Sequence, residues 1–117
     1  MNHNQKIGRW GEQVAAEYLQ KQGYMLVDRN VRTPYGEIDL IFKRGEIMVF
    51  VEVKTRTSAG FGYPEEAITP RKQQHMFDSA EHYAQENKLE HWRIDAISVE
   101  GKPNGGEPKI THFEDIL

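Results

Sequence analysis

The fold of this chain is predicted most directly by residues 36–56, GEIDLIFKRGEIMVFVEVKTR. Two apolar runs lie on either side of a glycine, a pattern that predicts two antiparallel strands joined by a tight turn. Asp39, Glu52 and Lys54 interrupt these runs. Buried strands avoid charge, because desolvating an unpaired ion costs several kcal/mol or forces the group to neutralise. These three charges therefore need a physical explanation.

The turn sets the register of the hairpin. A two-residue turn at positions 45–46, with glycine first, is a favoured hairpin type. In that register Asp39 lies directly opposite Glu52, because side chains alternate between faces along a strand. Lys54 follows two residues after Glu52 and shares the same side of the sheet. The other side is expected to carry Ile38, Leu40, Phe42, Val49, Val51 and Val53. A three-residue turn would instead place the two carboxylates on opposite faces unless a bulge intervened.

Two carboxylates that face each other across a strand pair repel and destabilise the pairing. One of them could hold a proton, as in carboxylate dyads. Alternatively, a hard cation such as Mg²⁺ could bind between them, since it prefers oxygen ligands. A third interpretation is that these are edge-strand charges that discourage aggregation, or that one of them forms a salt bridge. The residue pattern alone leaves these alternatives open.

The rest of the chain predicts two helices and three further strands. Helices are expected at 6–22 and from a cap at Thr69 to about residue 88, strands at 24–30, 92–100 and 110–113, and loops at 31–35, 57–64 and 101–108. The inner stripe of the second helix is expected to contain Met76, Phe77, Ala80, Tyr83 and Ala84, and strand 92–100 is expected to alternate with Ile94 and Ala96 inward. The order α-β-β-β-α-β-β predicts an α/β fold, a sheet flanked by helices, in a single domain over residues 1–117.

Composition narrows the possible classes of protein. The 117 residues include no cysteine, which excludes disulfides and thiolate metal sites, and the five histidines show no zinc spacing. No apolar run approaches the roughly 18 residues that span a bilayer, and no secretory signal begins the chain, so a cytoplasmic protein without a membrane is expected. The net charge is -3, but eight Lys and Arg against six Asp and Glu give +2 over residues 29–72.

The spacing of Asp39, twelve residues, then Glu52-Val53-Lys54 resembles the motif of the PD-(D/E)xK nuclease superfamily. Further stretches resemble the YraN family of bacterial predicted endonucleases over nearly the whole chain. They are GRWGEQVAAEYL at 8–19, RNVRTPYGEIDLI at 29–41, FVEVKTR at 50–56, FGYPEEAITPRKQQ at 61–74 and RIDAISVE at 93–100. This resemblance implies a restriction-endonuclease-like core with a mixed sheet, α-β-β-β-α-β(-β).

The resemblance also implies roles for individual residues. Asp39 and Glu52, with the backbone carbonyl of Val53, would coordinate Mg²⁺ or Mn²⁺. Lys54 would orient or deprotonate the attacking water, or steady the pentavalent phosphate. Glu12 matches the extra acidic residue of Holliday-junction-resolvase-like members. The expected activity is metal-dependent hydrolysis of phosphodiester bonds in DNA, with branched or flap structures of repair or recombination as candidate substrates.

Four further residues are expected to bind the substrate. Arg32 and Arg56 are candidate phosphate contacts, which position a nucleic acid without reading its sequence. Lys72 and Gln73 open the inner stripe of the second helix, where they could reach the scissile phosphate, and the resemblance includes a Lys-Gln at this place. A homodimer is attractive because cutting both strands usually requires two active sites. The alternatives are a non-catalytic nucleic-acid- or protein-binding module that keeps the nuclease fold, and a scaffold within a larger machine.

Overall fold

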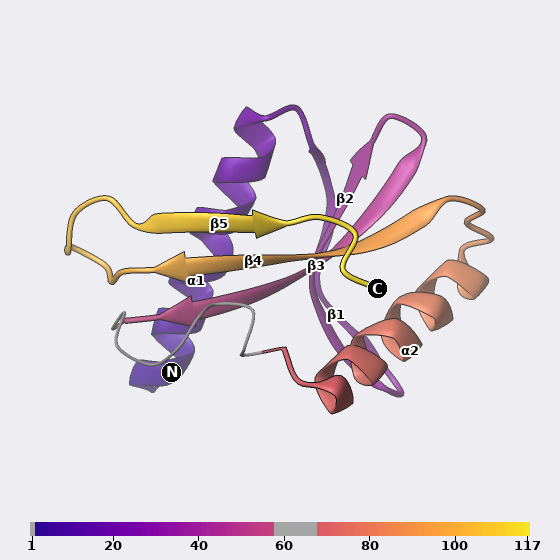
Figure 1. Ribbon diagram of the computed structural model, residues 1–117, viewed down its shortest axis with the longest axis horizontal. Helices are drawn as coiled ribbons and strands as arrows, with labels where there is room; N and C mark the ends of the chain where they lie inside the picture. Colours follow the sequence, from indigo (N-terminus) through magenta and orange to yellow (C-terminus); the bar gives the residue numbers. More distant parts are fainter. Residues whose placement is uncertain (1, 58–67) are drawn as a thin grey trace.

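Five strands and two helices form the described parts of the chain, residues 2–57 and 68–117 of a computed structural model (Figure 1). Their order is α1 (His3–Lys21), β1 (Met25–Thr33), β2 (Gly36–Arg44), β3 (Ile47–Arg56), α2 (Pro70–Glu86), β4 (Trp92–Glu100) and β5 (Lys109–Phe113). This is the predicted order of elements. The loop expected at 57–64 lies, apart from residue 57, outside the described residues.

The strands form one mixed sheet in the order β1-β2-β3-β4-β5. Only the β3–β4 pair among the described strands is parallel, and α2 lies in the connection between these two strands. Helix α1 packs on one face of the sheet through Ala15, Ala16 and Leu19. Helix α2 packs on the other face through Ala80 (Figure 1). The architecture is therefore an α/β fold with a helix on each side of a mixed sheet.

Both helices begin at caps that satisfy free backbone N–H groups. Asn2 and Gln5 form a capping box, and this places the start of α1 at His3, earlier than the expected residue 6. The Thr69 side chain accepts the N–H of Lys72, which confirms the predicted cap of α2. In the inner stripe of α2, Phe77 is 38% exposed and lies at the edge, where its ring meets that of Trp92.

The hairpin β2–β3 has the predicted register. Leu40 pairs with Val51 and Arg44 with Ile47, and Gly45 adopts a positive φ of 60°, which suits glycine in the turn. The pairing ends at Leu40, where β2 separates from β3. The prediction that Ile38 shares the face of Leu40 is wrong, because Ile38 packs on the α2 face.

The loop expected at 31–35 is also wrong in part. Strand β1 continues to Thr33, which pairs with Gly36, and only a two-residue turn remains. The Thr33 hydroxyl donates to the Gly36 carbonyl (2.7 Å) and accepts the Tyr35 N–H (3.1 Å), so a side chain completes the turn. The proline at position 34 lies inside this turn, where its fixed φ does not interrupt the ladder.

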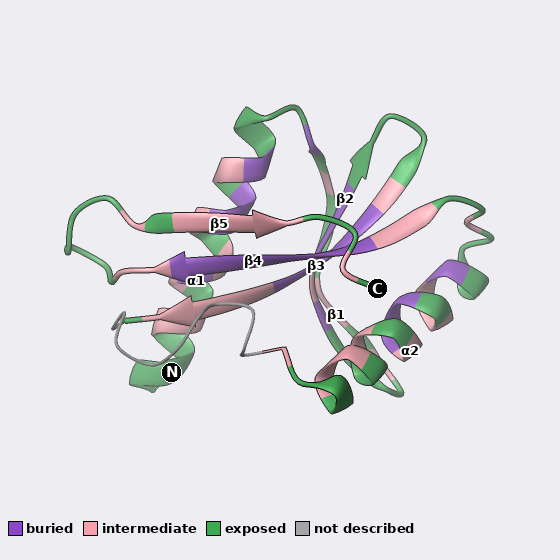
Figure 2. Ribbon diagram, viewed as in Figure 1, coloured by how far each residue is buried: buried purple, intermediate pink, exposed green. Residues whose placement is uncertain are grey.

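Strand β4 is buried on both faces rather than on one. The simple alternation expected for residues 92–100 is wrong, because residues 94–99 are all buried (Figure 2). A strand with neighbours on both sides and a helix over each face has no solvent-facing side. Two polar residues of this strand, Asp95 and Ser98, are therefore buried. Within the described residues, neither helix is long and apolar enough to cross a membrane.

Candidate functional site

Asp39 and Glu52 come together at the place where β2 separates from β3. The N–H of Val53 donates to Asp39 Oδ2 (2.8 Å), which fixes the Asp39 carboxyl beside β3. Burial raises the pKa of Asp39 to about 8, and the negative charges of Glu52 and Glu12 add to this increase. At neutral pH and without a bound cation, the pair therefore holds a proton. This is one of the two remedies for opposed carboxylates that the sequence left open.

Two lysines flank the carboxylate pair. Lys72, in the first turn of α2, places its Nζ 2.6 Å from Glu52 Oε1. Burial lowers the pKa of Lys72, but the hydrogen bond and charge of Glu52 outweigh that effect and raise it. Lys54 lies two residues beyond Glu52 on β3, and its pKa is lowered by burial and then by the neighbouring Lys72 charge. Lys54 is therefore the lysine that gives up its proton more readily.

Asn30 connects this site to α1. Its side-chain amide donates to Glu12 Oε1 (3.0 Å) and to Glu37 Oε1 (3.2 Å), so one amide links α1, β1 and β2. The backbone of Asn30 has a positive φ of 52°, a conformation that Asn tolerates better than most residues. The sequence analysis missed Asn30 and Glu37. An asparagine within a strand and a glutamate two residues before Asp39 are the only signals in the sequence.

Two hollows open on either side of Glu37. One of about 270 Å³ contains the carboxylate pair and Lys72, and its lining is Tyr35, Gly36, Glu37, Asp39, Glu52, Lys72, His75, Met76 and Ser79. The other, of about 520 Å³, is lined by Gln5, Gly8, Arg9, Glu12, Asn30, Arg32 and Glu37. Arg32 thus lies beside the site rather than in it, together with an unpredicted Arg9.

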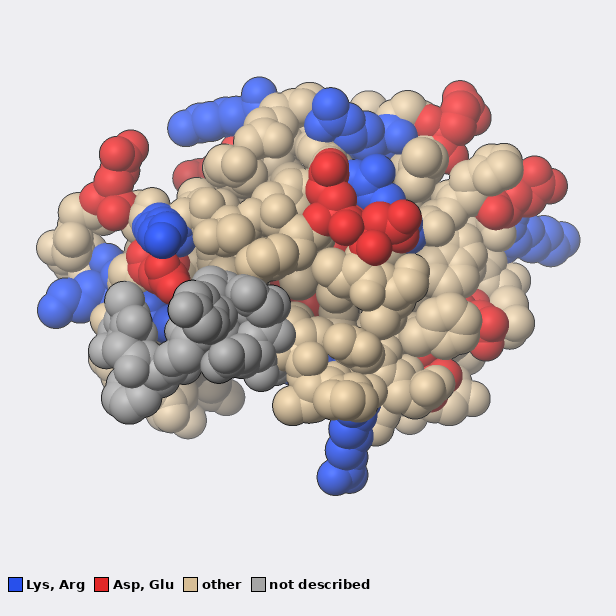
Figure 3. Space-filling model, in the orientation of Figure 1, with Lys and Arg blue, Asp and Glu red and all other residues tan. Residues whose placement is uncertain are grey.

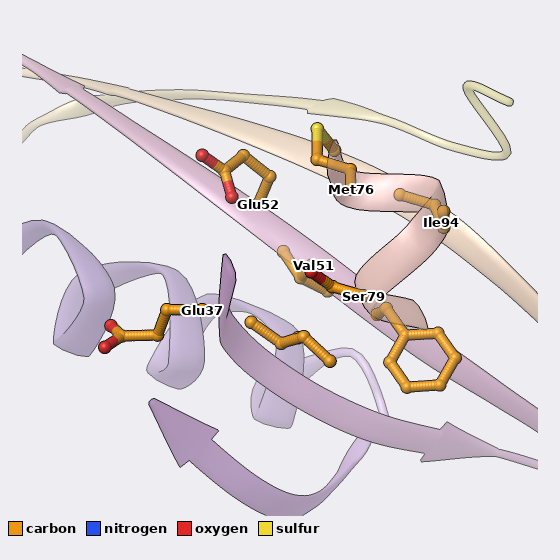
Figure 4. Close-up of a pocket in the computed structure, with 8 residues that line it drawn as sticks. Glu37, Val51, Glu52, Met76, Ser79 and Ile94 are labelled. Carbon is orange, nitrogen blue, oxygen red and sulfur yellow. The ribbon is translucent and has the colours of Figure 1, made fainter. Parts of the chain in front are cut away.

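A small apolar cavity of about 20 Å³ lies next to Glu52, between β3 and α2 (Figure 4). Met76 and Ser79 of α2 and Val51 of β3 border it, and Glu52 projects from β3 at its edge (Figure 4). The carboxylate therefore has apolar atoms on one side and the larger hollow on the other. This position explains why Glu52 is almost fully buried although it is charged.

The remaining two predicted substrate residues lie farther along the same elements. The side-chain amide of Gln73 donates to the Ile68 carbonyl (3.4 Å), which ties it to the start of α2. Arg56 is the last residue of β3, and its carbonyl accepts the N–H of Gly101. The structure thus brings together Asp39, Glu52, Val53, Lys54 and Lys72, places Glu12 and Arg32 beside them, and gives Gln73 a different partner.

A second charged group, which the sequence analysis missed, lies around Asp95. The Asp95 side chain is completely buried and accepts hydrogen bonds from Arg93 Nε (3.0 Å) and the Asp115 N–H (2.9 Å), with His112 Nε2 2.8 Å away. Burial raises the pKa of Asp95, but these partners outweigh burial and lower it. The ligand atoms of Asp95, His112 and Glu114 lie within 4.8 Å of one another, so this group could hold a metal ion.

This second group lies on the opposite face of the sheet from Glu52. Asp95 pairs with Val51 in the parallel β3–β4 ladder, and Val51 belongs to the core beneath α1. Glu52, one residue later, points to the other face. Histidine spacing gave no indication of the group, because its members are brought together only by the pairing of β4 with β5.

The fold and the site define an α/β protein whose mixed sheet carries a carboxylate pair, buried Glu52 and partly buried Asp39, flanked by two lysines. Comparison with known families then places the chain more closely. The sequence model described as "Uncharacterised protein family UPF0102" matches residues 11–99. The chain belongs to this family, which confirms the family-level resemblance to YraN, while membership of the nuclease superfamily stays a prediction.

UPF0102 proteins of several organisms are similar to this chain. A UPF0102 protein of Dehalococcoides mccartyi is 48% identical over 121 residues, covering 100% of this chain and 98% of the relative. One from Rhodococcus opacus is 42% identical over 120 residues and covers 100% of both chains. One from Syntrophotalea carbinolica is 42% identical over 109 residues, covering 92% of this chain and 87% of the relative. The similarity to the first two relatives extends over the full length of this chain.

Proposed function

We propose that this protein is a metal-dependent nuclease that hydrolyses phosphodiester bonds in DNA. The observation that carries the proposal is the contact of Asp39 with β3 beside Glu52, in a hollow where the pKa of Asp39 rises to about 8. Strongly perturbed carboxyl groups in a cleft are typical of functional sites. The two lysines beside this pair supply positive charge where a phosphate would approach.

The residues present fit a hard divalent cation. Asp39 and Glu52 offer carboxylate oxygens, which Mg²⁺ and Mn²⁺ prefer, and Val53 offers a backbone carbonyl next to them. The proton held by the pair at neutral pH is the species that such a cation would replace. A bound Mg²⁺ or Mn²⁺ would supply an activated water and neutralise charge that develops on the phosphate.

The side chains around the pair divide the remaining work. Lys54 has a lowered pKa, and it is positioned to orient the attacking water or accept its proton. Lys72 carries a full charge and is positioned to hold the scissile phosphate. Glu12 is held by Asn30, so it can orient water around the cation without adding a direct ligand.

The two hollows suggest how a nucleic-acid strand would lie. A strand whose phosphate reaches the carboxylate pair can continue into the hollow with Arg9 and Arg32. Arg56, farther along β3, is a candidate contact on the side of the Gly101 backbone. Such contacts with phosphates position DNA independently of its sequence. A DNA substrate agrees with a cytoplasmic location, and a homodimer would supply two sites for cutting both strands.

A cleavage assay tests the proposal. Branched, flap, double-stranded and single-stranded DNAs, with matching RNAs, are incubated with Mg²⁺ or Mn²⁺, and products are separated on denaturing gels. Cleavage is expected for the native protein and is expected to fall by at least about 10²-fold in Asp39→Asn, because electrostatic stabilisation of the transition state is lost. Glu46→Gln, at the exposed turn between β2 and β3, is the matched control. Equal cleavage rates for the native protein and Asp39→Asn would refute the proposed nuclease activity.

The alternative is a nucleic-acid- or protein-binding module without cleavage. The observation that favours it is the charge distribution, because Lys and Arg alternate with Asp and Glu on the face shown in Figure 3 and the net charge is -3. DNA binding that is tight in all variants, with no cleavage under any metal, would support this alternative. The same assay therefore separates the two functions.

A further inference from the structure

The contact between Lys72 and Glu52 has a consequence for cation binding. The Lys72 ammonium lies 2.6 Å from Glu52 Oε1, an ion-pair distance, and Lys72 belongs to α2 whereas Glu52 belongs to β3. Glu52 is one of the two carboxylates proposed to hold the divalent cation. An ammonium group and a metal ion compete for the same oxygen, because each is attracted by its negative charge.

The surroundings of the two side chains favour exchange over a permanent pair. The Glu52 side chain is only 10% exposed and cannot move far, whereas the Lys72 side chain is 37% exposed and borders the open hollow. Lysine has a flexible four-carbon stem with a single charged head. The pair can therefore be broken by rotation of Lys72 into the hollow, with Glu52 left in place.

We propose that Lys72 is an internal counter-ion of Glu52 that a divalent cation must displace, and that the displaced ammonium then binds the substrate phosphate. The inference rests on the proposed function. Repulsion between the cation and the ammonium drives Lys72 away from Glu52. Lys54 of β3 already lies beside Lys72 and occupies that direction. When a substrate phosphate lies in the hollow that contains the carboxylate pair, the Lys72 ammonium is most stable beside that phosphate.

The coupling has a direction that can be measured. Lys72 weakens cation binding when no substrate is present, since the ion pair must be broken first. It strengthens substrate binding once the cation is in place, since the freed ammonium gains a new anion. Cation and nucleic acid therefore bind with positive coupling that depends on this lysine.

Calorimetry with Mn²⁺ alone tests whether the cation must displace Lys72 from Glu52. Lys72→Met keeps most of the stem and removes the charge, Lys72→Arg keeps the charge, and Arg71→Met removes a neighbouring exposed charge as a control. We expect Lys72→Met to bind Mn²⁺ about fivefold more tightly than the native protein, which is the equilibrium factor of an ion pair of ordinary strength. Lys72→Arg and Arg71→Met are expected to stay within about twofold of the native dissociation constant by the same measure.

DNA binding in the presence of Ca²⁺ or of chelator tests whether the displaced Lys72 ammonium binds the substrate phosphate. A fluorescent flap oligonucleotide is titrated by anisotropy, and the gain in affinity on adding Ca²⁺ is compared between variants. We expect this gain to be several times larger in the native protein than in Lys72→Met, and unchanged in Arg71→Met. Circular dichroism verifies that each variant is folded before titration. If Lys72→Met does not fold, the comparison is made with Lys72→Arg.

The outcomes distinguish this inference from the proposed function. Equal Mn²⁺ affinities in Lys72→Met, Arg71→Met and the native protein would overturn the counter-ion role and leave a metal-dependent nuclease standing. A native protein that binds no Mn²⁺ at all would overturn both. Tighter Mn²⁺ binding in Lys72→Met together with a reduced Ca²⁺-dependent gain supports the full cycle.

Discussion

The pKa of Asp39 predicts an unusual dependence of stability on pH when no metal is bound. The carboxyl has a pKa of about 8 in the folded protein, against about 3.9 for an unperturbed aspartate in the unfolded chain. Between these two values the folded state binds one more proton than the unfolded state. The free energy of unfolding therefore falls as pH rises, and the loss is complete once pH passes the folded pKa.

The size of the effect follows from the same shift. Each pH unit within the window lowers the free energy of unfolding by up to ~1.4 kcal/mol, since one proton is involved. Because the folded Asp39 carboxyl is already partly ionised at the upper end of this range, we expect a loss of about 3 kcal/mol between about pH 5 and about pH 8. Asp95 does not add to this loss. Its pKa is lowered in the folded protein, so its contribution to stability is constant above the pKa of an unfolded aspartate and decreases only at lower pH.

Urea denaturation in the presence of chelator measures this loss. Asp39→Asn keeps the shape of the side chain and its contact with the Val53 N–H, but it removes the charge. We expect its free energy of unfolding to exceed that of the native protein by about 3 kcal/mol at about pH 8, and to differ little at about pH 5. Glu46→Gln removes an exposed carboxylate from the same hairpin and should follow the native curve at both pH values.

Metal ions should restore the stability lost at high pH in the native protein but not in Asp39→Asn. Mn²⁺ replaces the shared proton, so it should stabilise the native protein more at about pH 8 than at about pH 6 and should release a proton on binding. Calorimetry in buffers of different ionisation enthalpy counts that proton. The reasoning fails if Asp39→Asn and the native protein show parallel stability curves in chelator, because the carboxyl would then titrate as an ordinary aspartate.

Three further predictions concern the structure around the site. Gly11→Ala should destabilise the protein by about 1–3 kcal/mol in urea, because a Cβ at this position clashes with Thr55 of β3. A Cβ at Gly8 in the same helix meets no atom in the part of the chain that the structure describes, so Gly8→Ala should be neutral or stabilising. Asp95→Asn should lower the free energy of unfolding by about 3 kcal/mol and leave Mn²⁺ affinity unchanged; loss of Mn²⁺ binding would place the metal at the second group instead. Ser98→Ala should change stability by less than about 1 kcal/mol, because the buried hydroxyl has no hydrogen-bond partner among the described residues.

The parts of the fold that the sequence predicted are those set by local patterns. The order of elements and the β2–β3 register follow from apolar periodicity and from one glycine turn. The errors arise where a distant residue decides the local structure. Ile38 changes face because β2 turns away from β3, and Asp95 is tolerated in the buried strand because Arg93 and His112 pair with it.

The candidate site shows the same division. Asp39, Glu52 and Lys54 could be placed on one face by counting positions along a hairpin, since the spacing is short. The helical stripe predicted that Lys72 faces the sheet, where it could reach a phosphate, and its Nζ lies beside Glu52. Gln73, one residue later, is rotated by about 100° around the helix and bonds to Ile68 instead. Such a difference depends on how α2 sits on the sheet, which no local pattern records.

The different partners of Asp39 and Asp95 lead us to expect the cation at the carboxylate pair rather than at the second group. Asp95 receives hydrogen bonds from Arg93 and from the Asp115 N–H and lies against His112, so its negative charge is already balanced. Within residues 2–57 and 68–117, Asp39 receives a hydrogen bond from the Val53 N–H and faces other carboxylates. The opposite directions of their pKa changes follow from this difference in partners. A cation that enters the second group competes with Arg93, whereas one that enters beside Asp39 must displace Lys72 from Glu52 but relieves the repulsion between the carboxylates, so we expect stronger binding at the carboxylate pair.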